Sequence, residues 1–114
     1  MISRKHRFHG RAGLRHVYQN GQAARNAHFL IKAATNPRRS EYRLAVVVSR
    51  KVHKSAVTRN RIRRRIYSLV RALEPSMKAQ KDLVISVFDA SITEQSPQEL
   101  NRQLKKQLKT LGVI

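Results

Sequence analysis

Residues 49–73 read SRKVHKSAVTRNRIRRRIYSLVRAL, and this stretch decides both the fold and the surface charge of the chain. Nine of its side chains are Lys or Arg, and none is Asp or Glu. Ser55 is a suitable N-cap, because its hydroxyl can accept a hydrogen bond from an amide of a first helical turn. Beyond it the apolar residues recur at helical spacing and form one stripe, which predicts an amphipathic helix. The stripe consists of Ile62, Ile66, Leu69, Val70 and Leu73.

The cations of this predicted helix surround its buried stripe. One edge carries Arg59 and Arg63, the other edge Arg61 and Arg65, and the opposite side Asn60 and Arg64. On an isolated helix, each like-charged pair four residues apart costs about 0.2 to 0.5 kcal/mol. The helix is therefore more stable beside a polyanion than alone, and its N-terminus has a positive dipole end suited to phosphate. We infer an anionic partner.

Two apolar stretches flank this helix. Residues 44–49 are apolar on both faces of an expected strand, and residues 82–88 are nearly so, which indicates interior strands covered by helices. The helix between them is long enough to form a crossover, so we expect a parallel β-α-β unit. Such crossovers are right-handed in about 98% of cases.

Shorter signals predict the other elements. Residues 11–19 have the pattern of a short helix, residues 28–34 alternate as a strand does, and residues 36–40 form a turn. A last helix begins at Ser96 and Glu99, a capping box around Pro97, and ends at Gly112. We expect an α+β two-layer sandwich with a small central sheet and about three helices.

The charge of the chain limits the class of its partner. The 114 residues include 25 Lys or Arg and 6 Asp or Glu, for a net charge of +19. Residues 1–65 hold 18 basic side chains and 1 acidic one, whereas residues 66–114 hold 7 and 5. Such a field steers the chain to polyanions and makes its affinity fall with salt. A membrane surface fits less well, because the basic residues are not arranged along one amphipathic surface helix.

The length predicts a single domain over residues 1–114 with one modest core. Residues 1–10 form a basic, flexible N-terminal arm, and the sequence leaves open whether it frays or contacts phosphates. Cysteine is absent, which excludes disulfides and thiolate zinc sites. The longest apolar run, residues 44–48, is too short to span a bilayer, and no signal-peptide core follows the N-terminus. We expect a soluble cytoplasmic protein.

The six carboxylates do not form a pattern expected of a protein nuclease. Asp82 and Asp89 bound the same strand, and on a fully extended strand they would lie about 23 Å apart, too far to share a metal pair. Glu99 belongs to the helix cap. His6 and His9 lie three residues apart without a second ligand pair, so zinc is not expected. We expect no catalytic residue here, although two imidazoles converging on one phosphate stay possible from sequence alone.

The basic stretch also resembles a known signature. Arg59-Asn60-Arg61, followed by Ile62-Arg63-Arg64 and preceded by Ser49-Arg50-Lys51 at the end of an apolar strand, resembles the RNR motif of the bacterial ribonuclease P protein component. The resemblance runs from about residue 6 to residue 108. It implies a fold like domain 2 of ribosomal protein S5, with an unusual left-handed crossover. It also implies the protein subunit of an endonuclease whose catalytic RNA, assisted by Mg²⁺, removes the 5′ leader of precursor tRNA.

Carried over by position, the resemblance implies two RNA surfaces. The surface for the ribonuclease P RNA comprises Arg50, Lys51, Lys54, Arg59, Asn60, Arg61, Arg63, Arg64 and Arg65. The cleft for the single-stranded leader, between the first helix and the sheet, comprises Phe8, Arg15, Tyr18, Lys32 and Ser49. Lys32 stands where some family members carry Tyr, so leader binding here would depend more on charge than on stacking.

The resemblance further implies a monomeric protein in a 1:1 complex with the RNA, and Mg²⁺ held mainly by the RNA or at its interface. Ligands to a metal in the protein are unknown. Two alternatives stay open. A structural ribosomal-type RNA-binding protein without an enzymatic role would have similar charge and a similar sheet, and only the order strand, SRK, loop, RNR, helix separates it. A protein-only ribonuclease would cleave without any RNA subunit.

Overall fold

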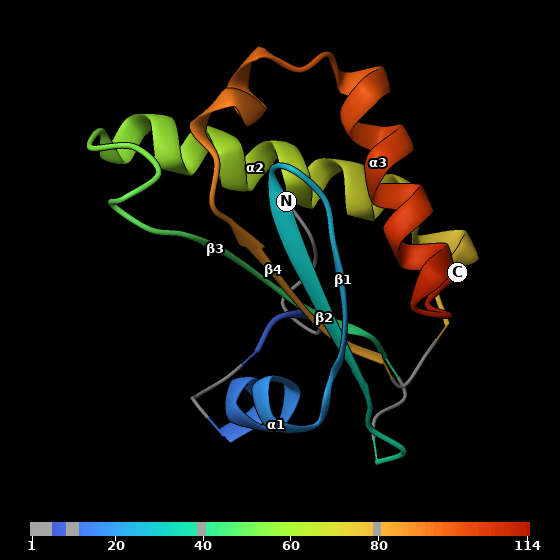
Figure 1. The fold of residues 1–114 in the computed structure, drawn as a ribbon. Coiled ribbons are helices and arrows are strands. Elements are labelled where there is room, and N and C mark those ends of the chain that lie inside the picture. Colours follow the sequence, from blue (N-terminus) through green and yellow to red (C-terminus); the bar gives the residue numbers. More distant parts are fainter. Residues whose placement is uncertain (1–5, 9–11, 39–40, 79–80) are drawn as a thin grey trace.

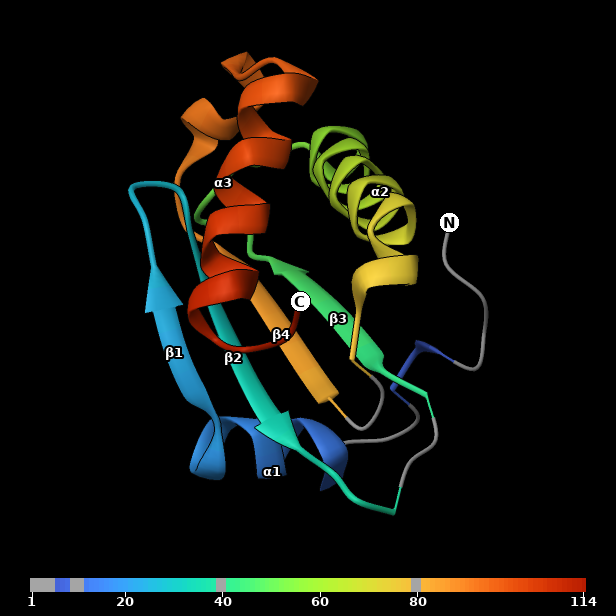
Figure 2. The ribbon, with the colours of Figure 1, turned by 90° about the vertical axis from the view of Figure 1, so that its right-hand side faces the viewer.

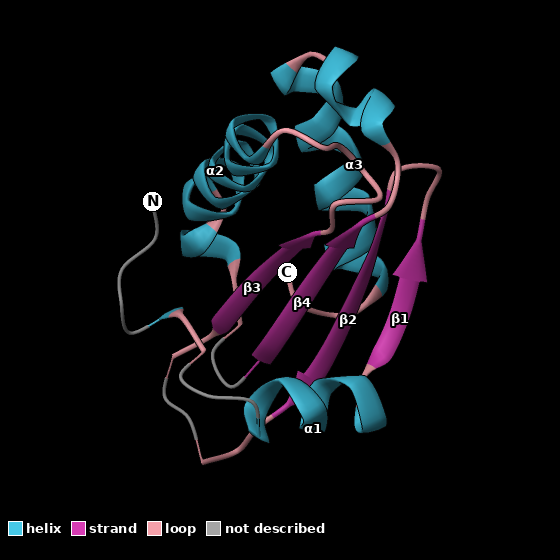
Figure 3. Ribbon diagram, turned by 90° about the vertical axis from the view of Figure 1, so that its left-hand side faces the viewer, coloured by secondary structure: helices cyan, strands magenta, loops and turns pink. Residues whose placement is uncertain are grey.

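The computed structural model describes residues 6–8, 12–38, 41–78 and 81–114 (Figure 1). Its helices and strands, in chain order, are α1 (Ala12–Asn20), β1 (Gln22–Arg25), β2 (Phe29–Thr35), β3 (Arg43–Val48), α2 (Ala56–Ala72), β4 (Lys81–Val87) and α3 (Pro97–Thr110). Two short 3₁₀ helices, η2 (Glu74–Ser76) and η3 (Ala90–Glu94), follow α2 and β4. The predicted α+β sandwich is confirmed, with α2 and α3 on one face of the sheet and α1 on the other (Figures 2 and 3).

The sheet has the order β1-β2-β4-β3 and contains the predicted β-α-β unit. Strands β3 and β4 are parallel neighbours joined through α2, while β2 pairs antiparallel with both β1 and β4. Figure 2 looks onto the face that α2 and α3 cover, and there both parallel strands run upward with β4 to the left of β3. A path that moves leftward through a helix on the near side is left-handed. The crossover therefore has the rare hand that the resemblance implied.

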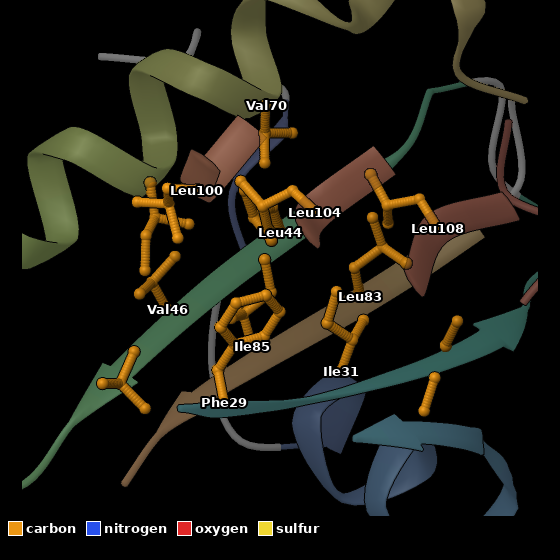
Figure 4. Packing of buried hydrophobic residues seen from close by; sticks show 14 of the residues in the cluster. Phe29, Ile31, Leu44, Val46, Val70, Leu83, Ile85, Leu100, Leu104 and Leu108 are labelled. Atoms are coloured by element: carbon orange, nitrogen blue, oxygen red, sulfur yellow. The ribbon is translucent and has the colours of Figure 1, made fainter. Parts of the chain in front are cut away.

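The main core lies between the sheet and the pair of helices α2 and α3 (Figure 4). Alternate residues of three strands face it, namely Phe29, Ile31, Leu44, Val46, Leu83 and Ile85. The helices contribute Ile62, Ile66, Val70, Leu100, Leu104 and Leu108, all of them buried. Full burial of one such aliphatic side chain stabilises the fold by about 1.5 to 3 kcal/mol. This packing fixes α2 with its basic side outward.

Both long helices begin at the predicted caps. The Ser55 hydroxyl accepts a hydrogen bond from the amide of Thr58 at 3.3 Å, and the Ser96 hydroxyl accepts one from the amide of Glu99 at 3.1 Å. The carboxylate of Glu99 accepts hydrogen bonds from the Arg102 guanidinium instead of returning to the cap. The second half of the predicted capping box was therefore wrong, because a nearby guanidinium is the stronger donor for a carboxylate.

Strand β3 lies at one edge of the sheet, and two contacts cover its outer side. Arg7 forms a parallel bridge with Leu44, and the hydroxyl of Tyr67 on α2 accepts a hydrogen bond from the amide of Val46 at 3.3 Å. Residues 6–8 of the expected flexible arm are thus held against the sheet. Residues 1–5 and 9–10 of that arm lie outside the described residues.

The arm is also held by an aromatic contact. The buried His6 ring stacks on Tyr42 with centroids 4.0 Å apart, and its Nδ1 lies 2.9 Å from the Tyr42 carbonyl oxygen. The Tyr42 hydroxyl donates a hydrogen bond of 2.6 Å to the carboxylate of Glu74, just after α2. Burial and the bonded Glu74 both raise the pKa of Tyr42. The contact ties the arm to the C-terminal end of α2.

In the described part of the chain, every helix is too short or too polar to span a bilayer.

Candidate RNA interface

The basic side of α2 lies on the surface. Asn60, Arg61 and Arg64 are exposed and form what we call the crest of α2, while Arg59, Arg63 and Arg65 are half-buried along its edges. None of the ion pairs found among the described residues involves residues 50–65. The protein's own acids therefore do not neutralise the crest, and its charge is available to an external anion.

The loop between β3 and α2 adds three more cations, because Arg50, Lys51 and Lys54 are all exposed. Arg59 fixes this loop: its Nη1 donates to the carbonyl oxygens of His53 and Lys54, both at 2.9 Å. Carbonyl groups have no net charge, so these bonds orient the guanidinium without cancelling it. The loop and the first turns of α2 form one continuous cationic surface.

Asn60, between the two arginines of the motif, uses half of its amide within the protein. Its Oδ1 accepts a hydrogen bond from Nη2 of Arg63. The NH₂ group is then the part of the amide left to donate to a sugar, base or phosphate.

The leader cleft was predicted between the first helix and the sheet, and α1 lies on the face opposite α2 and α3 (Figure 3). Helix α1 covers one half of that face through a small apolar cluster of Phe8, Leu14, Val17, Ala34, Ala45 and Val84. The strand registers place four further side chains in one row across all four strands: Arg25, Leu30, Ser86 and Val47. We call this row the open face, because α1 does not cover it and Val47 there is 41% exposed.

Two cation–aromatic pairs lie beside the open face. The Nζ of Lys32 is 5.6 Å from the ring centroid of Tyr18, which is 45% exposed. The guanidinium of Arg25 lies 4.5 Å from the ring centroid of Phe88, which is 41% exposed. Rings that stack bases and cations that attract phosphates are the two components of surfaces for single-stranded nucleic acid.

The other predicted cleft residues lie at different places. Ser49 is exposed and directly follows β3, which ends at Val48. Phe8 is half-buried in the cluster beneath α1, with the Arg43 guanidinium 4.6 Å from its ring centroid. Arg15 is exposed on α1, nearly opposite the buried Val17, and therefore points away from the sheet. The structure thus brings Tyr18 and Lys32 together beside the open face, places Ser49 just after β3, and leaves Phe8 and Arg15 outside the open face.

Arg25 and Phe88 are surface residues that sequence reasoning did not single out. Arg25 lies on β1, a strand that the sequence did not predict. Phe88 continues the alternation of Val84 and Ser86 on β4, so its place on this side could have been read from the strand period.

Asp82 and Asp89 are engaged in structural contacts. The fully buried carboxylate of Asp82 accepts hydrogen bonds from Arg43 at 2.9 and 2.7 Å and from Asn36 at 3.2 Å. The two bonds from Arg43 raise the pKa of its guanidinium. Asp89 lies 3.6 Å from Nδ1 of His28. Among the described residues, no three His, Asp or Glu side chains are grouped in a way that could hold a metal ion. The described donor set does not fit a Mg²⁺ site formed by the protein alone.

Comparisons of the sequence with known proteins all point to one family. The family model described as Ribonuclease P matches residues 2–112. The ribonuclease P protein component of a Pseudanabaena species is 30% identical over 114 residues, which cover 100% of this chain and 97% of that protein. The component of a Synechocystis species is 31% identical over 98 residues, or 86% and 78% of the two chains.

Solved structures show the same fold. The RNase P protein of Staphylococcus aureus superposes with a TM-score of 0.82 at 23% identity, covering 95% of this chain and 96% of that one. The RNase P protein of Thermotoga maritima gives a TM-score of 0.76 at 20% identity, covering 92% and 94%. With its sequence matched over nearly its whole length, this chain belongs to the ribonuclease P protein family.

Proposed function

We propose that this chain is the protein subunit of a ribonuclease P, which binds the catalytic RNA subunit through the crest of α2 and the preceding loop. The observation that carries this proposal is the exposed cationic surface of residues 50–65, which no described acid neutralises. Each phosphate that a Lys or Arg neutralises releases condensed counterions, so such a surface binds RNA strongly at low salt. Because the chain belongs to the ribonuclease P protein family, we take this RNA to be the ribonuclease P RNA.

The second half of the proposal assigns the 5′ leader of precursor tRNA to the open face. Tyr18 and Phe88 offer exposed rings there, and stacking of one base on an aromatic ring is worth about 1 to 3 kcal/mol. Lys32 and Arg25, already next to these rings, would attract the leader phosphates. Base stacking and phosphate contacts depend little on base identity, so one such surface could bind leaders of different sequence.

Bond cleavage is assigned to the RNA subunit and not to side chains of this chain. Asp82 is paired with Arg43 and Glu99 with Arg102, so these carboxylates are not placed as a pair of metal-binding acids. Mg²⁺ would be held mainly by the RNA or at its interface. The contribution of the protein, one copy to each RNA, is to bring cationic charge to the RNA and to orient the leader.

Reconstitution tests the proposal. The purified chain, freed of nucleic acid, is added to a bacterial ribonuclease P RNA and precursor tRNA at low Mg²⁺. We expect the protein to stimulate cleavage at the 5′ end of the mature tRNA and to cleave nothing without the RNA. Binding to the RNA without stimulation would favour a purely structural RNA-binding protein. Cleavage by the protein alone would favour a protein-only ribonuclease.

A further inference from the structure

Helix α2, the η3 segment and the start of α3 surround a cavity of about 470 Å³. It lies on the side of the sheet opposite the open face, between the first half of α2 and the orange segment after β4 in Figure 1. Its volume falls within the range of about 300 to 1,000 Å³ that is usual for small-molecule sites.

The cavity has an apolar floor and a cationic rim. Its floor is formed by four buried aliphatic side chains, Ile62, Ile66, Ile92 and Leu100. Arg61, Arg65 and His53 line its outer part, and no described lining residue is acidic. A nucleotide matches this division, because the base can cover the aliphatic floor while the phosphate meets a guanidinium. A purely apolar ligand would instead desolvate two guanidinium groups without supplying a counter-charge.

Two groups on the rim are already held in position. Nη2 of Arg65 donates a hydrogen bond to the carbonyl oxygen of Gln95. Nδ1 of His53 accepts one from the amide of Ser55 at 3.0 Å, which leaves the Nε2–H of the neutral ring as a donor. Donors that are fixed before binding lose less conformational entropy when a ligand arrives.

Arg61 connects this cavity with the crest of α2. The same side chain lines a shallow depression on the crest together with Val57, Asn60 and Arg64. An RNA backbone lying along the crest would therefore pass the mouth of the cavity.

We propose that the cavity receives one unpaired nucleotide of the RNA subunit, turned out of its stack, while the neighbouring phosphates lie on the crest. This inference rests on the proposed function, because it takes the RNA subunit as the ligand of α2. It adds a contact that requires an unpaired base at one position. Phosphate contacts alone would not fix the register of α2 on the RNA.

A tryptophan at Thr93 tests the proposal. Thr93 is exposed at the cavity and its hydroxyl donates to the Ala90 carbonyl, so Thr93→Trp fills the space without removing a core residue or a charge. Thr110→Trp is the matched control: it is exposed on α3, outside the cavity, with a similar bond to the Lys106 carbonyl. Circular dichroism melting shows whether both variants fold. We expect Thr93→Trp to weaken binding to a ribonuclease P RNA about tenfold, with an unchanged salt slope because no phosphate contact is lost.

Chemical probing of the RNA identifies the occupant. One unpaired nucleotide is expected to be protected in complexes with the wild-type protein and Thr110→Trp, and reactive in the saturated complex with Thr93→Trp. In methyl NMR spectra, AMP is expected to shift the methyl resonances of Ile62, Ile92 and Leu100 in the wild-type protein. It is expected to leave them unshifted in Thr93→Trp, where the tryptophan fills the cavity.

Equal affinity and equal protection for Thr93→Trp and wild type would overturn the proposal. So would AMP shifts without any difference in RNA protection, since the cavity would then take free nucleotides. RNA binding by the wild-type protein tests the proposed function, whereas the difference between the two tryptophan variants tests the cavity.

Discussion

Removal of the buried carboxylate of Asp82 is expected to destabilise the fold strongly. Asp82 is 0% exposed, and both of its oxygens accept hydrogen bonds from Arg43. Arg43 in turn lies over the ring of Phe8, so the ion pair joins β3, β4 and the end of the N-terminal arm. The substitution Asp82→Ala leaves a largely buried guanidinium without its counter-charge.

The expected size of the loss follows from that burial. Breaking a buried ion pair by removing one partner costs about 3 to 5 kcal/mol. The side chain of Arg43 keeps 13% of its surface exposed, so we expect the lower end, about 3 kcal/mol. For a domain with a total stability of about 5 to 15 kcal/mol, that loss lowers Tm by roughly 10 °C or more.

Urea unfolding followed by circular dichroism measures the effect, with Glu94→Ala as the control because Glu94 is exposed. The control is expected to change the free energy of unfolding by less than about 0.5 kcal/mol. A double-mutant cycle with Arg43→Met and Asp82→Leu isolates the pair. The double variant is expected to be more stable than the sum of the two single losses predicts, by about 2 kcal/mol. Additive losses, or an Asp82→Ala loss no larger than that of the control, would refute the reasoning.

Three further outcomes are expected. Arg64→Ala is expected to reduce the slope of log affinity for the RNA subunit against log salt by nearly one unit, whereas Lys105→Ala, on the exposed side of α3, leaves the slope unchanged. Filter binding over a salt series measures both slopes, and equal slopes would show that Arg64 contacts no phosphate. Tyr18→Ala weakens binding of precursor tRNA about tenfold and spares mature tRNA, and equal losses would contradict the assignment of the open face. Burial and the bond to Glu74 raise the pKa of Tyr42, so above about pH 10 the unfolded chain loses this proton first and stability falls. Tyr42→Phe flattens this alkaline decline, and superimposable alkaline unfolding curves would exclude the effect.

The helices of this fold could be predicted because their signals are local. The caps Ser55 and Ser96 and the apolar stripes after them locate α2 and α3 without knowledge of the rest of the chain. Strand β1 was missed because QAAR has little strand propensity and buries only Ala24. It forms because Asn26 Oδ1 accepts hydrogen bonds from two following amides and turns the chain back onto β2.

The candidate surfaces divide in the same way. The crest of α2 follows from the spacing of consecutive residues, so the sequence places Arg61 and Arg64 correctly on the outside. The pairing of Arg25 with Phe88, and of Arg43 with Asp82, depends on the registers of distant strands, which no local pattern specifies. The hand of the crossover is equally non-local, and the general preference would have given the wrong one.

The covered edge of β3 has a consequence for self-association. An edge strand with free amides and carbonyls is where a second copy of a chain can add by β-augmentation and begin a polymer. Here Arg7 and Tyr67 already occupy the outer side of β3 at Leu44 and Val46. The arm and α2 thus cover the edge of β3 and oppose aggregation through it. A protein shortened past residue 8 would lose the bridge that Arg7 forms with Leu44. Without residues 1–8 the chain also lacks Arg4, Lys5 and Arg7, so its net charge falls from +19 to +16. That charge would still keep copies apart in dilute buffer, but salt would screen the repulsion and favour assembly through the uncovered edge.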